Sequence, residues 1–142
     1  MKLEEGAKAG FIGGIISGIL LAFGYVFFVL PDIINKLTRR YDVASGGMFS
    51  IYANINNVYI FYFFGQILNG ISLGILFGIL FSMSEEYIPV KNNIVKGIFL
   101  STIIWFIIFP FLKYKTFSFL FISFISYTLL GFIVGTLYER KT

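Results

Sequence analysis

Long runs without a charged residue constrain this sequence more than any other feature. Charged side chains are absent from residues 9–31, 43–84, 97–112 and 116–138. A helix rises about 1.5 Å per residue, so about 20 apolar residues cross a hydrocarbon core of about 30 Å. Three of the runs reach that length. The third run, with 16 residues, covers only about 24 Å, so we expect Lys96 and Lys113 at its ends to extend toward the two head-group layers.

The composition agrees with a membrane protein and excludes several functional classes. Of the 142 residues, 58% are hydrophobic and 13% are charged, and the mean hydropathy is +0.88, which leaves too little polar surface for a soluble domain. Cysteine and histidine are absent, which excludes disulfides, thiolate chemistry and the commonest zinc ligands, and no cofactor is expected. The net charge of +4 comes from Lys and Arg scattered in short loops, so we expect the lipid bilayer to supply their counter-ions and no nucleic acid to bind.

The charge-free runs predict an all-α integral membrane protein, with four transmembrane helices in a single membrane domain over 1–142. The expected spans are about 7–30, 58–83, 94–112 and 117–138. The segment 31–57 between the first two spans is expected to lie at the membrane interface and to begin with a short amphipathic helix. Pro31 is expected to end the first helix, and Pro110 to fall in the last turn of the third. The first span is too long for a signal peptide, so we expect it to be retained.

The orientation of such a multi-pass protein in the cell membrane follows the excess of Lys and Arg on the cytoplasmic side. With four spans, six of these basic residues lie on the side of the two termini and five lie on the other. Both termini are therefore expected in the cytoplasm, by a margin of one residue.

Small residues recur every four positions in three of the four expected helices. A spacing of four places residues on one helix face, and glycine there lets a neighbouring backbone approach closely. We therefore expect the helices to pack through Gly-xxx-Gly faces. The glycines of these faces are Gly10, Gly14, Gly18, Gly70, Gly74, Gly78, Gly131 and Gly135.

Three polar residues inside the second span, Gln66, Asn69 and Ser72, lie on or close to its glycine face. Their side-chain oxygens could line a small polar path or bind a desolvated cation. The alternative is hydrogen bonding to another helix, which is worth about 1 kcal/mol. Trp105, near the middle of the third span, is interpreted as a packing or lipid-facing aromatic residue.

No acidic or basic residue lies within the charge-free runs that form the interior of the expected spans, which disfavours a stand-alone proton-coupled exporter or ion pump. The sequence also has no phosphate loop and no nucleophile beside a base, so it does not indicate an enzyme. Asp32 and Asp42 share one side of the membrane in the four-helix topology and are candidate ligands for a hard divalent metal ion. The alternative is that they are interfacial charges balanced by nearby Lys and Arg. Glu85 and Glu86 fall on the opposite side.

The run Pro110-Phe111-Leu112-Lys113-Tyr114, which follows an apolar helix, resembles the CbtA family of predicted cobalt-transporter membrane subunits. The segments Pro31-Asp32-Ile33-Ile34 and Tyr41-Asp42, and the stretch from Gly70 to Gly78, are similar to the pattern of that family. The chain differs in having Lys115 where members carry a proline, and four helices where they typically carry five. The resemblance implies a transport-related subunit for a divalent metal such as cobalt, acting with a partner.

Two functional hypotheses therefore remain. The resemblance favours a CbtA-like transport subunit whose partner supplies metal ligands or the driving force. The residues themselves favour a structural accessory subunit that packs against other membrane protein subunits, in a homo- or hetero-oligomer, and transports nothing. Close-packing faces are plentiful in this sequence and metal ligands are scarce.

Overall fold

The computed structural model describes residues 2–36, 55–112 and 116–139, and this part of the chain is helical with no strand. Its elements are α1 (Lys2–Phe28), α3 (Ile55–Ser84), α4 (Asn93–Ile108), the 3-10 helix η2 (Phe109–Phe111) and α5 (Phe117–Glu139). Four helical stretches are long and apolar enough to span a membrane: Lys2–Lys36, Tyr59–Ser84, Asn93–Phe111 and Phe117–Tyr138. The prediction of an all-helical chain with four such helices is confirmed.

The first helix begins earlier than the sequence predicts. Its first turn carries Glu4 and Glu5, whose negative charge suits a helix N-terminus, and Lys8 pairs with Glu4 at 2.6 Å. α1 ends at Phe28, but after a turn at Val29 the chain resumes helical turns over 30–36. Pro31 has no N–H to donate to an earlier carbonyl, which accounts for the interruption, but its fixed φ is compatible with the new helical turns. The rest of the predicted interfacial segment, 37–54, lies outside the described residues.

Local hydrogen bonding sets both ends of α4. The side chain of Asn92 caps its start by accepting hydrogen bonds from the N–H groups of Ile94 and Val95, at 2.8 and 3.3 Å. At the other end Pro110 lies within η2, so the last turn tightens into a 3-10 helix. Pro110 thus falls in the last helical turn before Leu112, where the sequence places it.

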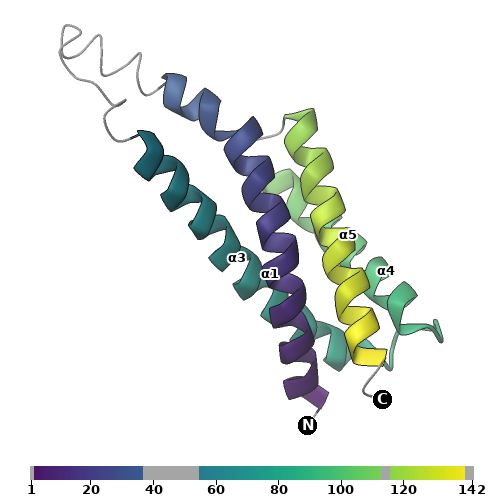
Figure 1. Cartoon of the computed structure of the whole chain (residues 1–142). Helices are drawn as coiled ribbons and strands as arrows, with labels where there is room; N and C mark the ends of the chain where they lie inside the picture. The colour runs from purple at the N-terminus through teal and green to yellow at the C-terminus, as the bar shows by residue number, and fades with distance from the viewer. Residues whose placement is uncertain (1, 37–54, 113–115, 140–142) are drawn as a thin grey trace, which may run out of the picture.

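The helices form an antiparallel arrangement in which α1 lies between α3 and α5, and α4 packs on the far side of α5 (Figure 1). α1 has its most extensive contact with α3, whereas α3 and α4 barely touch. Both ends of the chain lie at the same end of the molecule (Figure 1). One long side of α3 is consequently not covered by the other described helices.

The best-packed part of the interior lies toward the end of the molecule that carries the termini. Buried side chains from three helices meet there, and Leu100 and Ile104 of α4 pack against them. The buried residues of this core are Ala9, Phe77, Phe81, Leu130, Val134 and Tyr138. The rings of Phe81 and Tyr138 meet edge to face, with centroids 5.4 Å apart, which fixes α3 against α5.

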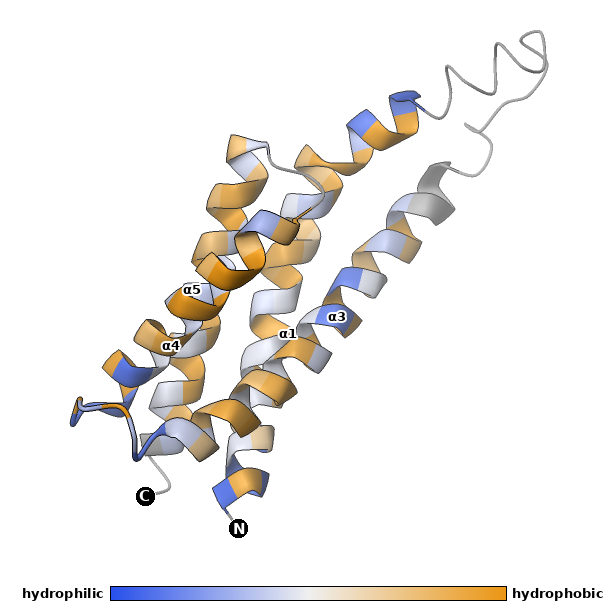
Figure 2. Ribbon diagram, turned by 180° about the vertical axis from the view of Figure 1, so that it is seen from behind, coloured by the Kyte–Doolittle hydropathy of each residue, from blue (hydrophilic) through white to orange (hydrophobic). Residues whose placement is uncertain are grey.

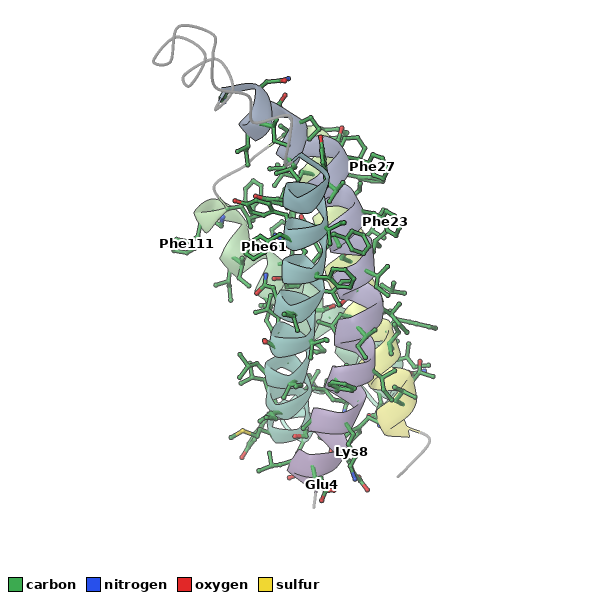
Figure 3. The ribbon with its side chains drawn as sticks, turned by 60° about the vertical axis from the view of Figure 1, so that its left-hand side comes forward. Glu4, Lys8, Phe23, Phe27, Phe61 and Phe111 are labelled. Atoms are coloured by element: carbon green, nitrogen blue, oxygen red, sulfur yellow. The ribbon has the colours of Figure 1, made fainter. Side chains whose placement is uncertain are left out.

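The exterior is lined by large apolar side chains. Hydrophobic residues continue around the outside of the helices (Figure 2). Phe23, Phe27, Phe61 and Phe111 point away from the bundle, and Phe61 and Phe111 are 73% and 83% exposed (Figure 3). A protein in water would rarely expose so continuous an apolar surface. This exterior is consistent with a multi-pass membrane protein.

Candidate functional site

Glycines of α1 and α3 face one another over four helical turns. A Cβ atom added to Gly14 would lie 2.5 Å from the carbonyl oxygen of Gly70, and one added to Gly74 would lie 2.5 Å from the Cα of Gly14. Carbon atoms in good contact are about 3.5–4.0 Å apart, so these positions accept no side chain without movement of a backbone. The same backbone contact recurs at the pairs Gly6 and Gly78, Gly10 and Gly74, and Gly18 and Gly70.

A second contact of this kind joins α4 to α5. A Cβ atom on Gly135 would lie 2.5 Å from the carbonyl oxygen of Asn93, and one on Gly131 would meet the backbone of Gly97. The four-residue spacing in the sequence points to Gly131 and Gly135 but not to Gly97, their counterpart on α4. The available signal was Ser101, a second small residue four positions after Gly97, which is fully buried here.

The contact between α1 and α5 has a different character, because side chains of α5 enter gaps left by glycines of α1. A Cβ on Gly13 would meet Leu130 Cδ1 at 2.9 Å, and one on Gly24 would meet Ile122 Cγ2 at 2.7 Å. In both cases the obstacle is a side chain, which can move more readily than a backbone.

A cavity of about 10 Å³ lies where α1, α3 and α5 meet, and Ser17 and Ser126 contribute to its lining. The Oγ atom of Ser126 is buried and has no hydrogen-bond partner within the described part of the chain. A volume of about 10–15 Å³ is the least that holds one water molecule. This cavity therefore cannot hold a metal ion with its ligand shell or any larger substrate.

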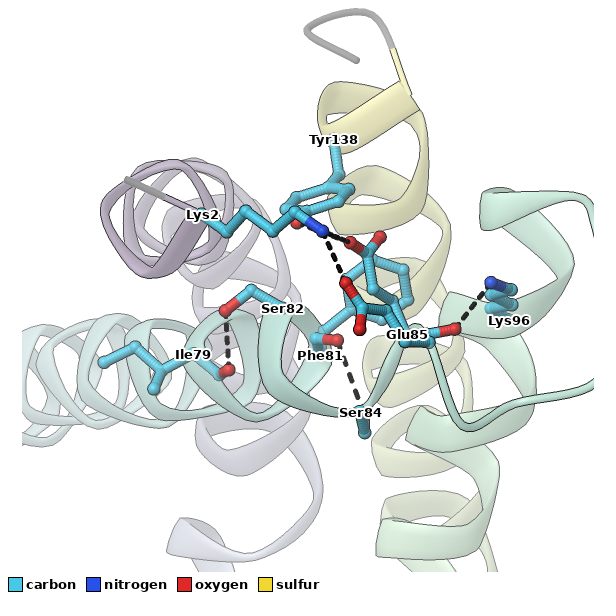
Figure 4. Close-up of polar contacts among 9 residues, drawn as sticks. Lys2, Ile79, Phe81, Ser82, Ser84, Glu85, Lys96 and Tyr138 are labelled. Atoms are coloured by element: carbon cyan, nitrogen blue, oxygen red, sulfur yellow. Dashed lines mark hydrogen bonds and ion pairs between the residues drawn. The ribbon is translucent and has the colours of Figure 1, made fainter.

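Polar side chains from every helix meet around Glu85, at the end of the molecule that carries the termini (Figure 4). Glu85 follows α3 and is only 8% exposed. The hydroxyl of Tyr138 donates a hydrogen bond to its Oε1 at 2.9 Å, and Nζ of Lys2 lies 3.5 Å from the same oxygen. Lys96 on α4 donates to the backbone carbonyl of Glu85 at 2.6 Å. This end cluster ties the ends of α1, α3, α4 and α5 together.

Lys2 also donates to Oε1 of Glu86 at 2.6 Å, and this hydrogen bond holds the pKa of the exposed Glu86 carboxyl below its usual range. In the sequence, Glu85 and Glu86 look like two equivalent carboxylates on the side opposite Asp32. In the structure Glu85 is buried and bonded to a tyrosine 53 residues further along. No local pattern carries that information.

The structure does not bring the three predicted polar residues of α3 together on its glycine face. Gln66 is half-buried, whereas Asn69 and Ser72 are exposed on the side turned away from α1. The hydroxyl of Ser72 donates to the carbonyl of Leu68 at 3.0 Å. Gln66 and Asn69 have no hydrogen-bond partner among the described residues. Three residues along a helix turn the side-chain direction by about −60° relative to a full turn. Asn69 and Ser72, three and six residues after Gln66, therefore point progressively further from the glycine stripe.

Of the predicted metal ligands, Asp32 is exposed on the helical turns over 30–36, and Asp42 lies outside the described residues. The described residues contain no group of three or more His, Cys, Asp or Glu side chains that could hold a metal ion. The metal site therefore stays a prediction.

Comparison with protein-family models, with curated proteins and with solved structures finds no match to this chain. The resemblance to the CbtA family thus rests on the quoted residues alone. The function has to be argued from the contacts just described.

Proposed function

We propose that this chain is a non-enzymatic subunit of the cell membrane whose role is assembly. Its four helices cross the lipid bilayer, pack through Gly-xxx-Gly faces and present the uncovered side of α3 to another membrane-spanning helix. The apolar exterior and the backbone contacts between facing glycines support this arrangement. In lipid, close packing of this kind supplies much of the attraction between helices, because lipid is as apolar as the side chains.

The observation that carries the proposal is the position of Asn69. It lies about 15 Å along α3 from Tyr59 and about 22 Å from Ser84, the two ends of that span. An amide placed in an apolar medium without a hydrogen bond costs about 2–7 kcal/mol. Asn69 is exposed there, and none of the described residues pairs with it. Its carboxamide therefore needs a partner that the described helices do not supply.

Hydroxyl side chains elsewhere on the helices do not create the same need. Ser72, Thr102, Thr128 and Thr136 each donate to a carbonyl four residues earlier in their own helix, at 2.8–3.0 Å. Asn69 makes no such bond. Gln66 is also an amide without a partner among the described residues, but it is half-buried, whereas Asn69 is exposed on the side of α3 that a further helix can reach.

The second candidate function is a metal-transport subunit of CbtA type, supported by the resemblance and by the exposed carboxylate of Asp32 at the end opposite the termini. In this proposal a partner supplies the remaining ligands and the path for the ion. The cavity of about 10 Å³ inside the bundle is too small for a metal ion with its ligands, which favours the assembly role.

One experiment tests both proposals. The protein is released from its native membrane without delipidation, and the intact mass and the metal content of the particle are measured for the wild type and for Asn69→Leu. We expect a wild-type assembly larger than one chain, which Asn69→Leu reduces, while the matched lipid-facing variant Phe121→Leu leaves it intact. A wild-type particle holding a single chain would refute the assembly role. Stoichiometric cobalt or nickel would favour the CbtA-type function.

The orientation is a further part of the proposal. The two termini lie at one end of the molecule, so they face the same compartment, and the excess of one basic residue places them in the cytoplasm (Figure 1). Labelling of a cysteine introduced at Thr142 by a membrane-impermeant reagent tests this. Labelling in intact cells would reverse the assignment.

A further inference from the structure

We propose that the partner docked on α3 is a second copy of this chain, related by a twofold axis that passes beside Asn69. The inference rests on the proposed assembly role and names its partner. The two copies cross the membrane in the same direction, so that α3 of one lies along α3 of the other.

The contact surface is the outer face of α3, formed by Gly65, Asn69, Ser72 and Leu76. These residues follow one another at spacings of four, three and four, which places them on a single stripe of the helix. Asn69 and Ser72 are exposed, and Leu76 is 58% exposed. Figure 2 shows hydrophilic ribbon part-way along α3, between longer hydrophobic stretches.

Gly65 gives this face the shape that a helix contact needs. A Cβ added to Gly65 would meet no heavy atom within 4 Å, whereas a Cβ on any other described glycine would meet a neighbouring helix. Gly65 therefore plays no part in packing among the described helices. One turn before Asn69, it leaves a notch in which a second backbone can come close.

The chemistry of the amide selects a second copy as the partner. A carboxamide carries two N–H donors and an acceptor oxygen, so across a twofold axis each Asn69 can donate to the oxygen of its counterpart. Two copies of one chain in the same direction place Asn69 at the same depth in the bilayer, so the two amides meet without further adjustment. The outer face carries no charge, so no like charges oppose the contact.

The complete absence of cysteine makes the proposal testable by disulfide formation between copies in the membrane. Single variants Gly65→Cys and Ser72→Cys are expected to cross-link to themselves, because a disulfide joins Cβ atoms about 3.5–4.5 Å apart. The matched control is Phe64→Cys. Phe64 is 60% exposed and next to Gly65 in the chain, but it is turned by about 100° from the outer face, so we expect it not to cross-link.

The role of the amide is tested in the Ser72→Cys background. Replacing Asn69 by leucine, which has a similar volume, should reduce cross-linking about tenfold, and Asn69→Gln should retain it. Gln66→Leu removes the same chemical group from another face of α3 and should change nothing. Helicity measured by circular dichroism shows whether each variant is folded, and Asn69→Ala provides a second test if the leucine variant is not.

The outcomes separate this inference from the proposed function. Cross-linking at positions 65 and 72 but not at 64, weakened by Asn69→Leu, supports the second copy. Equal cross-linking at all three positions, or none at 65 and 72, overturns it. If the cross-linking test fails while the native particle still holds more than one chain, the chains associate in another way and the assembly role stands. A native particle with a single chain overturns both.

Discussion

Replacing Gly74 by alanine tests how closely the backbones of α1 and α3 are packed. The added Cβ would lie 2.5 Å from the Cα of Gly14, whereas carbon atoms are in good contact at about 3.5–4.0 Å. The two helices therefore have to separate by about 1 Å or more at this turn. A gap of that size removes about a quarter to a half of the dispersion energy of each contact it opens.

The separation also affects the neighbouring turns, because Gly70 and Gly78 touch the same face of α1. Overpacking of a well-fitted interior costs about 1–3 kcal/mol. Since the obstacle at Gly74 is backbone, we expect Gly74→Ala to destabilise the fold at the upper end of that range, by about 3 kcal/mol. Gly74→Leu, with three more carbon atoms, should abolish the contact between α1 and α3 and with it the assembly.

Two other glycines serve as controls. Gly65→Ala adds the same methyl group where no described atom of the chain lies within 4 Å, so in the monomer, at high detergent-to-protein ratio, it should stabilise the helix by about 0.5–1 kcal/mol through its better helix propensity. Gly13→Ala would meet side chains of α5 only, the nearest being the end of Leu130 at 2.9 Å, and should fall between the other two variants.

The free energy of unfolding can be measured by titrating SDS into mixed micelles and following helicity. The expected order of stability is Gly65→Ala, wild type, Gly13→Ala and then Gly74→Ala. If Gly74→Ala proved as stable as Gly65→Ala, the reasoning from backbone contact would be wrong.

The remaining predictions concern buried polar groups and use the same unfolding assay. Tyr138→Phe should cost about 1.5–3 kcal/mol, because the buried Glu85 carboxylate loses a hydroxyl donor, and an unchanged stability would contradict the end cluster. Trp105→Phe removes the indole N–H that donates to Ser123 at 3.0 Å and shortens a buried ring, so it should cost more than about 1 kcal/mol; a cost below about 0.3 kcal/mol would count against that bond. Ser126→Ala should leave stability unchanged or raise it by up to about 1 kcal/mol, because the hydroxyl has no partner among the described residues, and a clear loss would reveal one.

The four helices could be predicted because each requires a long run free of charge, and a run of that kind can be read directly from the sequence. The residues at which each helix begins and ends were harder to predict. The first span was expected to begin at about residue 7, but an acidic first turn and a Glu4 to Lys8 pair extend α1 back to Lys2. A charge therefore marks where a helix leaves an apolar environment, which is not always where the helix itself ends.

The candidate site could be predicted only in part. A spacing of four identifies a helix face, so the sequence singles out glycines that share a face, but it does not say which helix lies opposite. Gly97 was missed because α4 has a single glycine, and the end cluster was missed because Glu85 and Tyr138 meet only through tertiary folding. Asn69 was grouped with Gln66 because the two are near in the chain, although three residues of rotation carry it toward the outer face of α3.

Both glycine contacts, α1 with α3 and α4 with α5, join helices that are neighbours in sequence. Each pair forms a hairpin whose two arms can close on one another without the rest of the chain, and contacts between near neighbours form fastest. Synthesis proceeds from the N-terminus, so the first hairpin can fold before the second has been translated. Once Ser84 has left the ribosome, every residue of the α1–α3 hairpin is already present, so α4 and α5 can pack against a hairpin that has already folded.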